Sequence, residues 1–167
     1  MFETIFRSVV GEFSDLSLPH AVRLAVRLLV AALMGGLLGW DRERAGKAAG
    51  LRTHILVATG AAAFMAIPQQ SGLDPNGLSR VLQGLIAGIG FLGAGCIMKG
   101  DTESQVRGLT TAAGIWLTAG VGVAAGMGRD MSALLLGGFG YFTLSAIGRW
   151  ERKLGLDDLS DESNRAR

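Results

Sequence analysis

The sequence lacks most of what enzymes, metalloproteins and nucleic-acid-binding proteins use. One cysteine, Cys96, is present among 167 residues, so no internal disulfide and no cysteine-rich zinc site can form. Charged residues make up 18%, against about 25% in typical soluble domains, and a net charge of +2 is too small to indicate a nucleic-acid partner. No serine-nucleophile motif of the G-x-S-x-G type occurs. We therefore predict no enzyme, no catalytic residues, no cofactor and no nucleic acid among the partners.

Glycine and long apolar runs are abundant instead. Five runs have the length of a bilayer span, which is about 20 residues. They cover approximately 20–40, 53–70, 81–98, 108–127 and 131–148. The last three contain no charged residue, and none of them shows the polar face of helical period that a soluble bundle would need. We therefore predict an all-α, polytopic membrane protein with about five transmembrane helices in a lipid bilayer.

Residues 1–18 have a different pattern. Their apolar side chains recur at helical spacing, with charged side chains on the remaining surface, which is typical of an amphipathic helix lying at the membrane interface. The apolar positions are Phe2, Ile5, Phe6, Val9, Val10, Phe13 and Leu16. The predicted organisation is an interfacial helix over 1–18, a transmembrane domain over 19–149 and a polar cytoplasmic tail over 150–167.

The distribution of Lys and Arg predicts the orientation of the chain. Eleven of the sixteen flank the ends of the spans that share a side with the tail, and five flank the opposite ends. Because Lys and Arg concentrate in cytoplasmic segments, we expect the N-terminus outside the cytoplasm and the C-terminus inside.

The third run contains the stretch GIGFLGAG, residues 88–95, which has the formal G-x-G-x-x-G spacing of a dinucleotide-binding loop. Such a loop needs a preceding strand, a helix opening at the glycines and an acidic residue about 20 positions later, and the surroundings supply none of these. Two interpretations stay open. Small residues four apart let another helix approach closely, or the glycines break the helix and expose carbonyl groups to a cavity, as in transporters. The packing interpretation concerns Gly84, Gly88, Gly90, Gly93 and Gly95, and similar pairs occur at Gly35 and Gly39 and at Gly122 and Gly126.

Polar side chains gather at the ends of the runs. The predicted cytoplasmic cluster consists of Asp41, Arg42, Glu43, Arg52, Thr53, Arg107, Thr110 and Thr111, and an outer group consists of Asp74, Arg80 and Gln83. Arg27 either extends to the headgroups or pairs with Asp74 or a polar cavity. The two histidines, His20 and His54, fall on opposite predicted sides and no carboxylate lies in the middle of a run, so we predict no metal site.

Three blocks together carry a family resemblance. DRERAGKAAGLRTHILVATGAA, GLIAGIGFLGAGCIMKG and VRGLTTAAGIWLTAGVGVAAG resemble, in order and spacing, the membrane domain of the MgtC/SapB family of bacterial inner-membrane proteins. The family's acidic residue before arginine corresponds to Asp41, where Glu is more usual, and its G-L-R-T corresponds to residues 50–53. The soluble C-terminal domain of the longer members has no counterpart in this sequence, so the short, SapB-like branch is the closer match.

The resemblance implies an accessory factor for growth under low magnesium, acid or host-cell stress. For the virulence-associated members it implies restraint of the F-type ATP synthase through membrane contacts. We accordingly expect a modulator of magnesium, ion or energy homeostasis that acts through helix contacts with a membrane partner or a second copy of itself. The competing hypothesis is a transporter or channel subunit for magnesium or another small solute, with the third span broken at its glycines.

Overall fold

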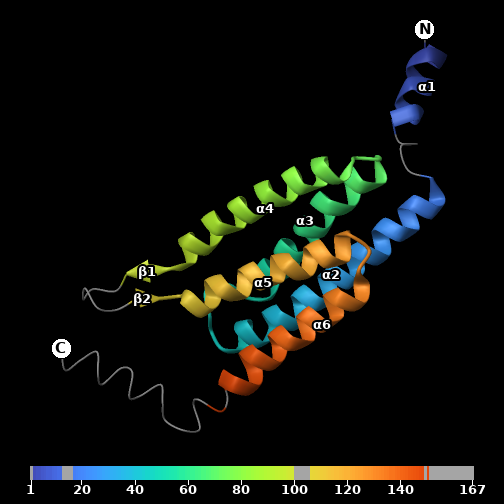
Figure 1. The fold of residues 1–167 in the computed structure, drawn as a ribbon. Coiled ribbons are helices and arrows are strands. Elements are labelled where there is room, and N and C mark those ends of the chain that lie inside the picture. The colour runs from blue at the N-terminus through green and yellow to red at the C-terminus, as the bar shows by residue number, and fades with distance from the viewer. Residues whose placement is uncertain (1, 13–16, 100–105, 149, 151–167) are drawn as a thin grey trace.

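The computed structural model describes residues 2–12, 17–99, 106–148 and 150 (Figure 1). Its helices and strands, in chain order, are α1 (Phe2–Glu12), α2 (Leu18–Arg44), α3 (Leu51–Gln70), α4 (Pro75–Cys96), β1 (Met98–Lys99), β2 (Val106–Arg107), α5 (Leu109–Gly126), α6 (Asp130–Tyr141) and the π-helix η1 (Phe142–Ile147). Within the described residues, five segments are long and apolar enough to cross a membrane: α2, α3, α4, α5 and α6 continued by η1. The prediction of an all-α polytopic protein is confirmed. The predicted tail beyond residue 150 lies outside the described residues.

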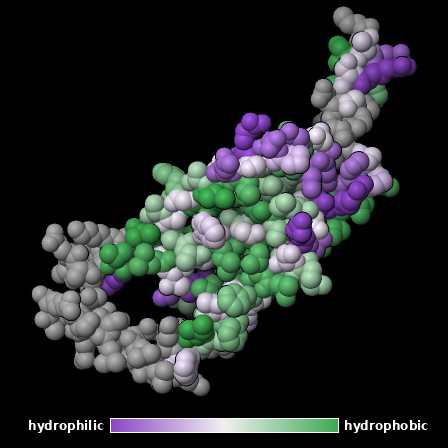
Figure 2. Space-filling model, viewed as in Figure 1, coloured by the Kyte–Doolittle hydropathy of each residue, from purple (hydrophilic) through white to green (hydrophobic). Residues whose placement is uncertain are grey.

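Helices run back and forth between two ends of a bundle (Figure 1). We call one the Asp74 end, where α3 connects to α4 and α5 connects to α6. The other is the hairpin end, where α2 connects to α3 and where β1 pairs with β2 in antiparallel register, Met98 opposite Arg107. Apolar side chains cover the middle of the visible face, and hydrophilic ones gather toward the Asp74 end (Figure 2). This distribution is the one expected for a protein that crosses a bilayer.

The helix boundaries follow local chemistry. Helix α4 begins six residues before the predicted run, because the Asp74 carboxylate accepts a hydrogen bond of 2.7 Å from the Gly77 amide and Pro75 occupies the first turn. Ser17 precedes α2 without capping it, since its hydroxyl lies 2.6 Å from Nδ1 of His20 instead. Polar residues can therefore extend a membrane helix beyond the apolar run that reveals it.

The core lies between α2, α3, α5 and α6 and is built from small side chains. Its buried members are Ala31, Leu38, Ala58, Ala62, Val121, Ala124, Ala125 and Ala133. A Cβ added at Gly35 would come within 2.6 Å of the His54 carbonyl oxygen, and one at Gly126 would overlap the backbone of Ala62. Such close approach supplies the van der Waals contact that holds helices together in lipid. The predicted packing of the pairs Gly35 and Gly39 and Gly122 and Gly126 is confirmed.

Helix α4 lies at the edge of this bundle, beside α5 (Figure 1). It is a continuous α-helix from Pro75 to Cys96 through all of its glycines. The idea that the third span breaks at these glycines is therefore wrong, and no phosphate-binding loop forms there either. An α-helix satisfies its own backbone hydrogen bonds, so glycine alone does not open it inside hydrocarbon.

Helix α1 stands apart from the bundle, beyond the start of α2 (Figure 1). Phe2, Ile5, Phe6 and Val9 are all more than half exposed. The amphipathic helix is thus present over Phe2–Glu12, and residues 1 and 13–16 of the predicted segment lie outside the described residues. A location at the membrane interface stays a prediction for this helix.

Candidate functional site

A polar cavity of about 480 Å³ opens at the hairpin end. It lies between the last turn of α2, the first turn of α5 and η1. Its lining residues are Asp41, Arg42, Ala45, Lys47, Val106, Gly108, Leu109, Thr110, Thr111, Thr143, Leu144, Ile147 and Gly148. Cavities of this size accommodate small organic ligands. We refer to it as the hairpin-end cavity.

Two glycines with left-handed backbone conformation shape this cavity. Gly46, with φ of +63°, turns the chain after α2, and the Lys47 amide then donates a 3.0 Å hydrogen bond to the Arg42 carbonyl. Gly108, with φ of +93°, precedes α5 where an added Cβ would overlap the Cys96 carbonyl oxygen. Residues with a Cβ adopt this conformation at a cost, so glycine is required at Gly108 on two independent grounds.

The polar lining combines charges with hydroxyl groups. Arg42 and Thr111 are almost completely buried, at 6% and 5% exposure, while Asp41 is half-buried and Lys47 is exposed. The Thr143 hydroxyl donates a 3.0 Å hydrogen bond to the Phe139 carbonyl. The cavity thus presents a guanidinium, an ammonium, one carboxylate and three threonines.

The predicted polar cluster is only partly assembled. Asp41, Arg42, Thr110 and Thr111 line the hairpin-end cavity, whereas Glu43, Arg52, Thr53 and Arg107 do not. The Glu43 carboxylate accepts a 2.7 Å hydrogen bond from the Leu51 amide and so joins the end of α2 to the start of α3. The other three are exposed. Sequence reasoning missed Lys47, which Gly46 turns toward the cavity, and Thr143, whose only signal was a hydroxyl in an apolar run.

His54 lies deeper, where α3 meets α2 and α5. It is 1% exposed, and its Nδ1 donates to the Gly50 carbonyl at 2.9 Å. Its Nε2 is sealed from solvent and has no hydrogen-bond partner among the described residues. A Cβ added at Gly114 of α5 would lie 3.7 Å from this nitrogen. The glycine leaves the space that the imidazole occupies.

Arg27 forms a partly buried junction at the Asp74 end. Its Nη1 donates 2.8 Å hydrogen bonds to the Gln69 side chain and to the Gly126 carbonyl, which is one of the last carbonyls of α5. The proposed pairing with Asp74 is wrong, because that carboxylate caps α4. Arg80 and Gln83 lie exposed on α4. Arg27 therefore ties together α2, α3 and α5, a role for which the sequence offers no marker besides a charge in an apolar run.

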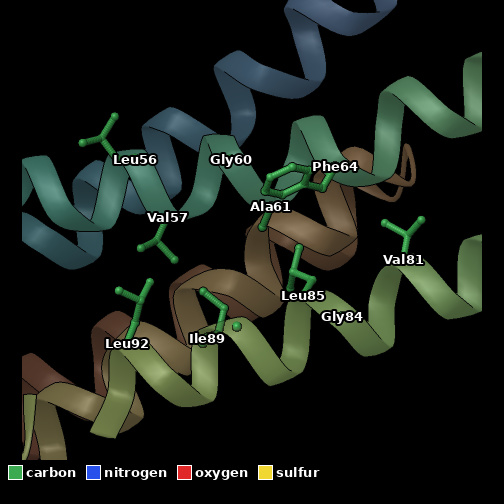
Figure 3. A pocket seen from close by; sticks show the side chains of 11 residues that line it. Leu56, Val57, Gly60, Ala61, Phe64, Val81, Gly84, Leu85, Ile89 and Leu92 are labelled. Atoms are coloured by element: carbon green, nitrogen blue, oxygen red, sulfur yellow. The ribbon is translucent and has the colours of Figure 1, made fainter. Parts of the chain in front are cut away.

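The five glycines of α4 for which helix packing is predicted contact almost nothing among the described residues. An added Cβ would meet no atom within 4 Å at Gly84, Gly88, Gly90 or Gly95, and at Gly93 it would lie 3.7 Å from the Ala112 Cβ. Between α3 and α4 runs an apolar groove of about 560 Å³, shown in Figure 3. Its walls consist of Leu56, Val57, Gly60, Ala61, Phe64, Val81, Gly84, Leu85, Gly88, Ile89 and Leu92. Helix packing by these glycines stays a prediction, because the described residues supply no helix that packs against them.

These features define a small multi-pass α-helical membrane protein with a polar cavity at one end and an apolar groove along one side. Among the described residues no group of three or more His, Cys, Asp and Glu could hold a metal ion. The chain belongs to the MgtC family, whose sequence profile matches residues 28–153.

Several curated proteins are similar in sequence. Protein SrpB of Synechococcus elongatus is 44% identical over 140 residues, 77% of each chain. Protein MgtC of Salmonella typhimurium is 46% identical over 109 residues, 65% of this chain and 46% of that protein. YhiD of Escherichia coli K12, named a putative magnesium transporter, is 41% identical over 113 residues, 62% of this chain and 50% of that protein. The chain thus spans about half the length of MgtC and YhiD. No solved structure matches it.

Proposed function

We propose that this protein is a non-enzymatic accessory component of the bacterial inner membrane that modulates magnesium-linked or energy homeostasis by contacting another membrane protein through α4. The link to magnesium is supported by the family and by the name of one relative. The excess of Lys and Arg at the hairpin end supports an orientation with that end and the C-terminus in the cytoplasm.

One observation carries the proposal, namely the apolar groove between α3 and α4 that no helix of the described chain fills. Gly60 lines one wall and Gly84 lines the other (Figure 3). Gly88, four residues after Gly84 on α4, lines the groove as well. Wherever glycines leave a helix face bare, a second backbone can approach closely and gain dispersion contacts that lipid chains supply less well. A transmembrane helix of a partner fits this surface.

The partner that the family resemblance implies is the membrane sector of the F-type ATP synthase. A second copy of this chain is the other candidate, since each copy offers the same glycine face for a symmetric contact. Both partners use the same surface. Variants in the groove therefore test the mode of action before the partner is known.

The test combines binding with activity. Gly84→Leu and Gly88→Leu place side chains in the groove, while Gly138→Leu on α6, where an added Cβ also meets nothing within 4 Å, is the matched control outside it. We expect wild type and Gly138→Leu to co-purify with, and lower the ATP hydrolysis of, ATP synthase in co-reconstituted vesicles, and the groove variants to do neither. Equal behaviour of all four proteins would contradict the proposal.

The same vesicles test the transport alternative. They are loaded with a magnesium-sensitive dye, and magnesium entry is compared with and without the protein. Flux that persists in the groove variants would favour a transporter or channel subunit over an accessory role. We expect no flux above that of empty vesicles.

A further inference from the structure

We propose that the hairpin-end cavity is a binding site for a phosphoryl group that carries a hydrogen-bond donor next to it. The two sources with this chemistry are a free phosphate compound, whose P–OH is the donor, and a phospholipid headgroup such as phosphatidylethanolamine, whose ammonium is the donor. This inference is independent of the contact proposed for α4.

The donors of the cavity match a tetrahedral oxyanion. Arg42 is 94% buried there, and although it also interacts within the protein, a guanidinium carries five N–H groups and can serve several acceptors. Lys47 adds a second positive charge from the opposite side of the Gly46 turn. Arginine and lysine together are typical of phosphate sites, because charge-assisted hydrogen bonds to phosphate oxygens are the strong ones.

Helix α5 begins at this cavity with free backbone amides. Gly108, Leu109, Thr110 and Thr111 all line the wall, and no side chain caps the helix at Gly108. The first amides of an 18-residue helix and its dipole favour an anion at that position. A carboxylate has two oxygens for these donors, whereas a phosphoryl group offers more and uses them better.

Thr111 supplies an independent indication of a ligand. It is 95% buried, and its hydroxyl makes no hydrogen bond to any other described residue. The sealed side-chain atoms without a partner in the described chain are His54 Nε2 and Asp130 Oδ1, and the Thr111 oxygen is not one of them. Its hydroxyl therefore reaches accessible space, which for this residue is the cavity. A hydroxyl that opens into the cavity and has no partner among the described residues can donate to or accept from a ligand there.

Asp41 explains why the ligand needs a donor. Its carboxylate lines the same cavity, half-buried, and has no hydrogen-bond partner within the described chain. An oxyanion without a donor would be repelled by it. Monohydrogen phosphate or an ethanolamine ammonium can instead donate to Asp41 while the phosphate oxygens accept from Arg42 and Lys47. The cavity volume of about 480 Å³ leaves room for the group attached to the phosphorus.

The experiment measures thermal stability of the full-length protein with defined probes. In detergent, inorganic phosphate is titrated against sulfate at equal ionic strength, because sulfate has no proton to donate to Asp41 at neutral pH. In nanodiscs, phosphatidylethanolamine is compared with phosphatidylcholine, whose quaternary ammonium has no N–H. Stabilisation by phosphate over sulfate identifies a free phosphate compound, and stabilisation by phosphatidylethanolamine over phosphatidylcholine identifies a lipid. Either result supports the proposal.

Three variants locate the effect. Thr111→Val keeps the shape and removes the hydroxyl, and Lys47→Gln removes an exposed charge without disturbing the core. We expect each of these two variants to lower the affinity for the stabilising probe about threefold to tenfold, because each loses one charge-assisted or buried hydrogen bond. Arg52→Gln, an exposed cation at the same end but outside the cavity, should leave it unchanged. No preference for either probe over its analogue, or equal loss in Arg52→Gln, would overturn the proposal.

Discussion

Helices α4 and α5 are both rich in glycine, yet they occupy opposite kinds of environment. More than half of the span in α5 is buried, at 56%, against 6% in α4. Two glycines of α5, Gly122 and Gly126, lie against the backbone of α3 at Ala58 and Ala62, while an added Cβ at Gly88 of α4 would meet nothing within 4 Å. A strip of small residues therefore permits close helix packing, but the packing forms only where the facing surface is also small.

The physical reason is that glycine stabilises a membrane helix only through what approaches it. Without water to exclude, association in lipid depends on dispersion contacts between matching surfaces. Gly122 and Gly126 of α5 face small alanines of α3, so the two backbones can come close. On α4 the same residue type faces the open groove, which leaves the stabilisation to another molecule.

The largest effect is expected from adding one methyl group to each of the two helices. Gly126→Ala places a Cβ into the backbone of Ala62, which no side-chain rotation can relieve. We expect a loss of about 3 kcal/mol in unfolding free energy, as overpacking of a tight core costs. Gly88→Ala, into open space, should leave stability unchanged or raise it slightly through helix propensity.

Both variants are compared by reversible unfolding in mixed micelles under identical conditions. The two substitutions are chemically the same, so differences in the unfolded state largely cancel. Equal destabilisation by both would mean that α4 is packed in the protein as α5 is, and the contrast between the helices would be lost.

A smaller effect is expected from the junction that ties α5 to its neighbours and that α4 lacks. Arg27→Met keeps most of the side-chain length but removes the hydrogen bonds to Gln69 and Gly126. Because it leaves part-buried polar groups without partners, we expect a cost of about 2 kcal/mol. The control is Arg23→Met, since exposed Arg23 donates a 3.2 Å hydrogen bond to the Pro19 carbonyl of its own helix and makes no hydrogen bond to another described helix. A comparable loss in the control would show that the charge, rather than the junction, matters.

The cap of α4 should matter less and only locally. Asp74→Ala removes the acceptor for the Gly77 amide, which costs about 1 kcal/mol in a typical helix. Since α4 packs loosely, we expect faster hydrogen exchange in its first turn with no change in α5. Asp74→Asn retains an acceptor and should restore most of the protection. Exchange that rises equally in α5 would show that the two helices unfold as one unit.

The sequence predicted the spans well because length and hydropathy decide membrane insertion. It could not predict which of α4 and α5 is buried in the bundle, since both helices are apolar and glycine-rich. Their burial depends on whether a facing residue such as Ala62 is small. The sequence predicted that Asp41 and Arg42 belong to a polar cluster, because these charges interrupt an apolar run. Lys47 joins them only because Gly46 adopts φ of +63°, which no pattern of residue types revealed. Arg27 was noticed, but its partners lie 42 and 99 residues away.

The substitutions with the smallest expected effect on stability are cysteines that carry a spin label inside or outside the groove. In a Cys96→Ala background, Gly84→Cys and Gly138→Cys introduce one label site each, at positions where an added Cβ meets nothing within 4 Å. Each should change unfolding free energy by less than about 0.5 kcal/mol, as exposed substitutions do. A spin label at either site should be mobile and accessible to dissolved oxygen in the purified protein.

In native membranes the label at Gly84 should become immobile while that at Gly138 stays unchanged, because only the first lies where a partner helix would dock. A Gly84 label that is already immobile in the purified protein would mean that α4 closes its own groove, and α4 would then resemble α5 after all.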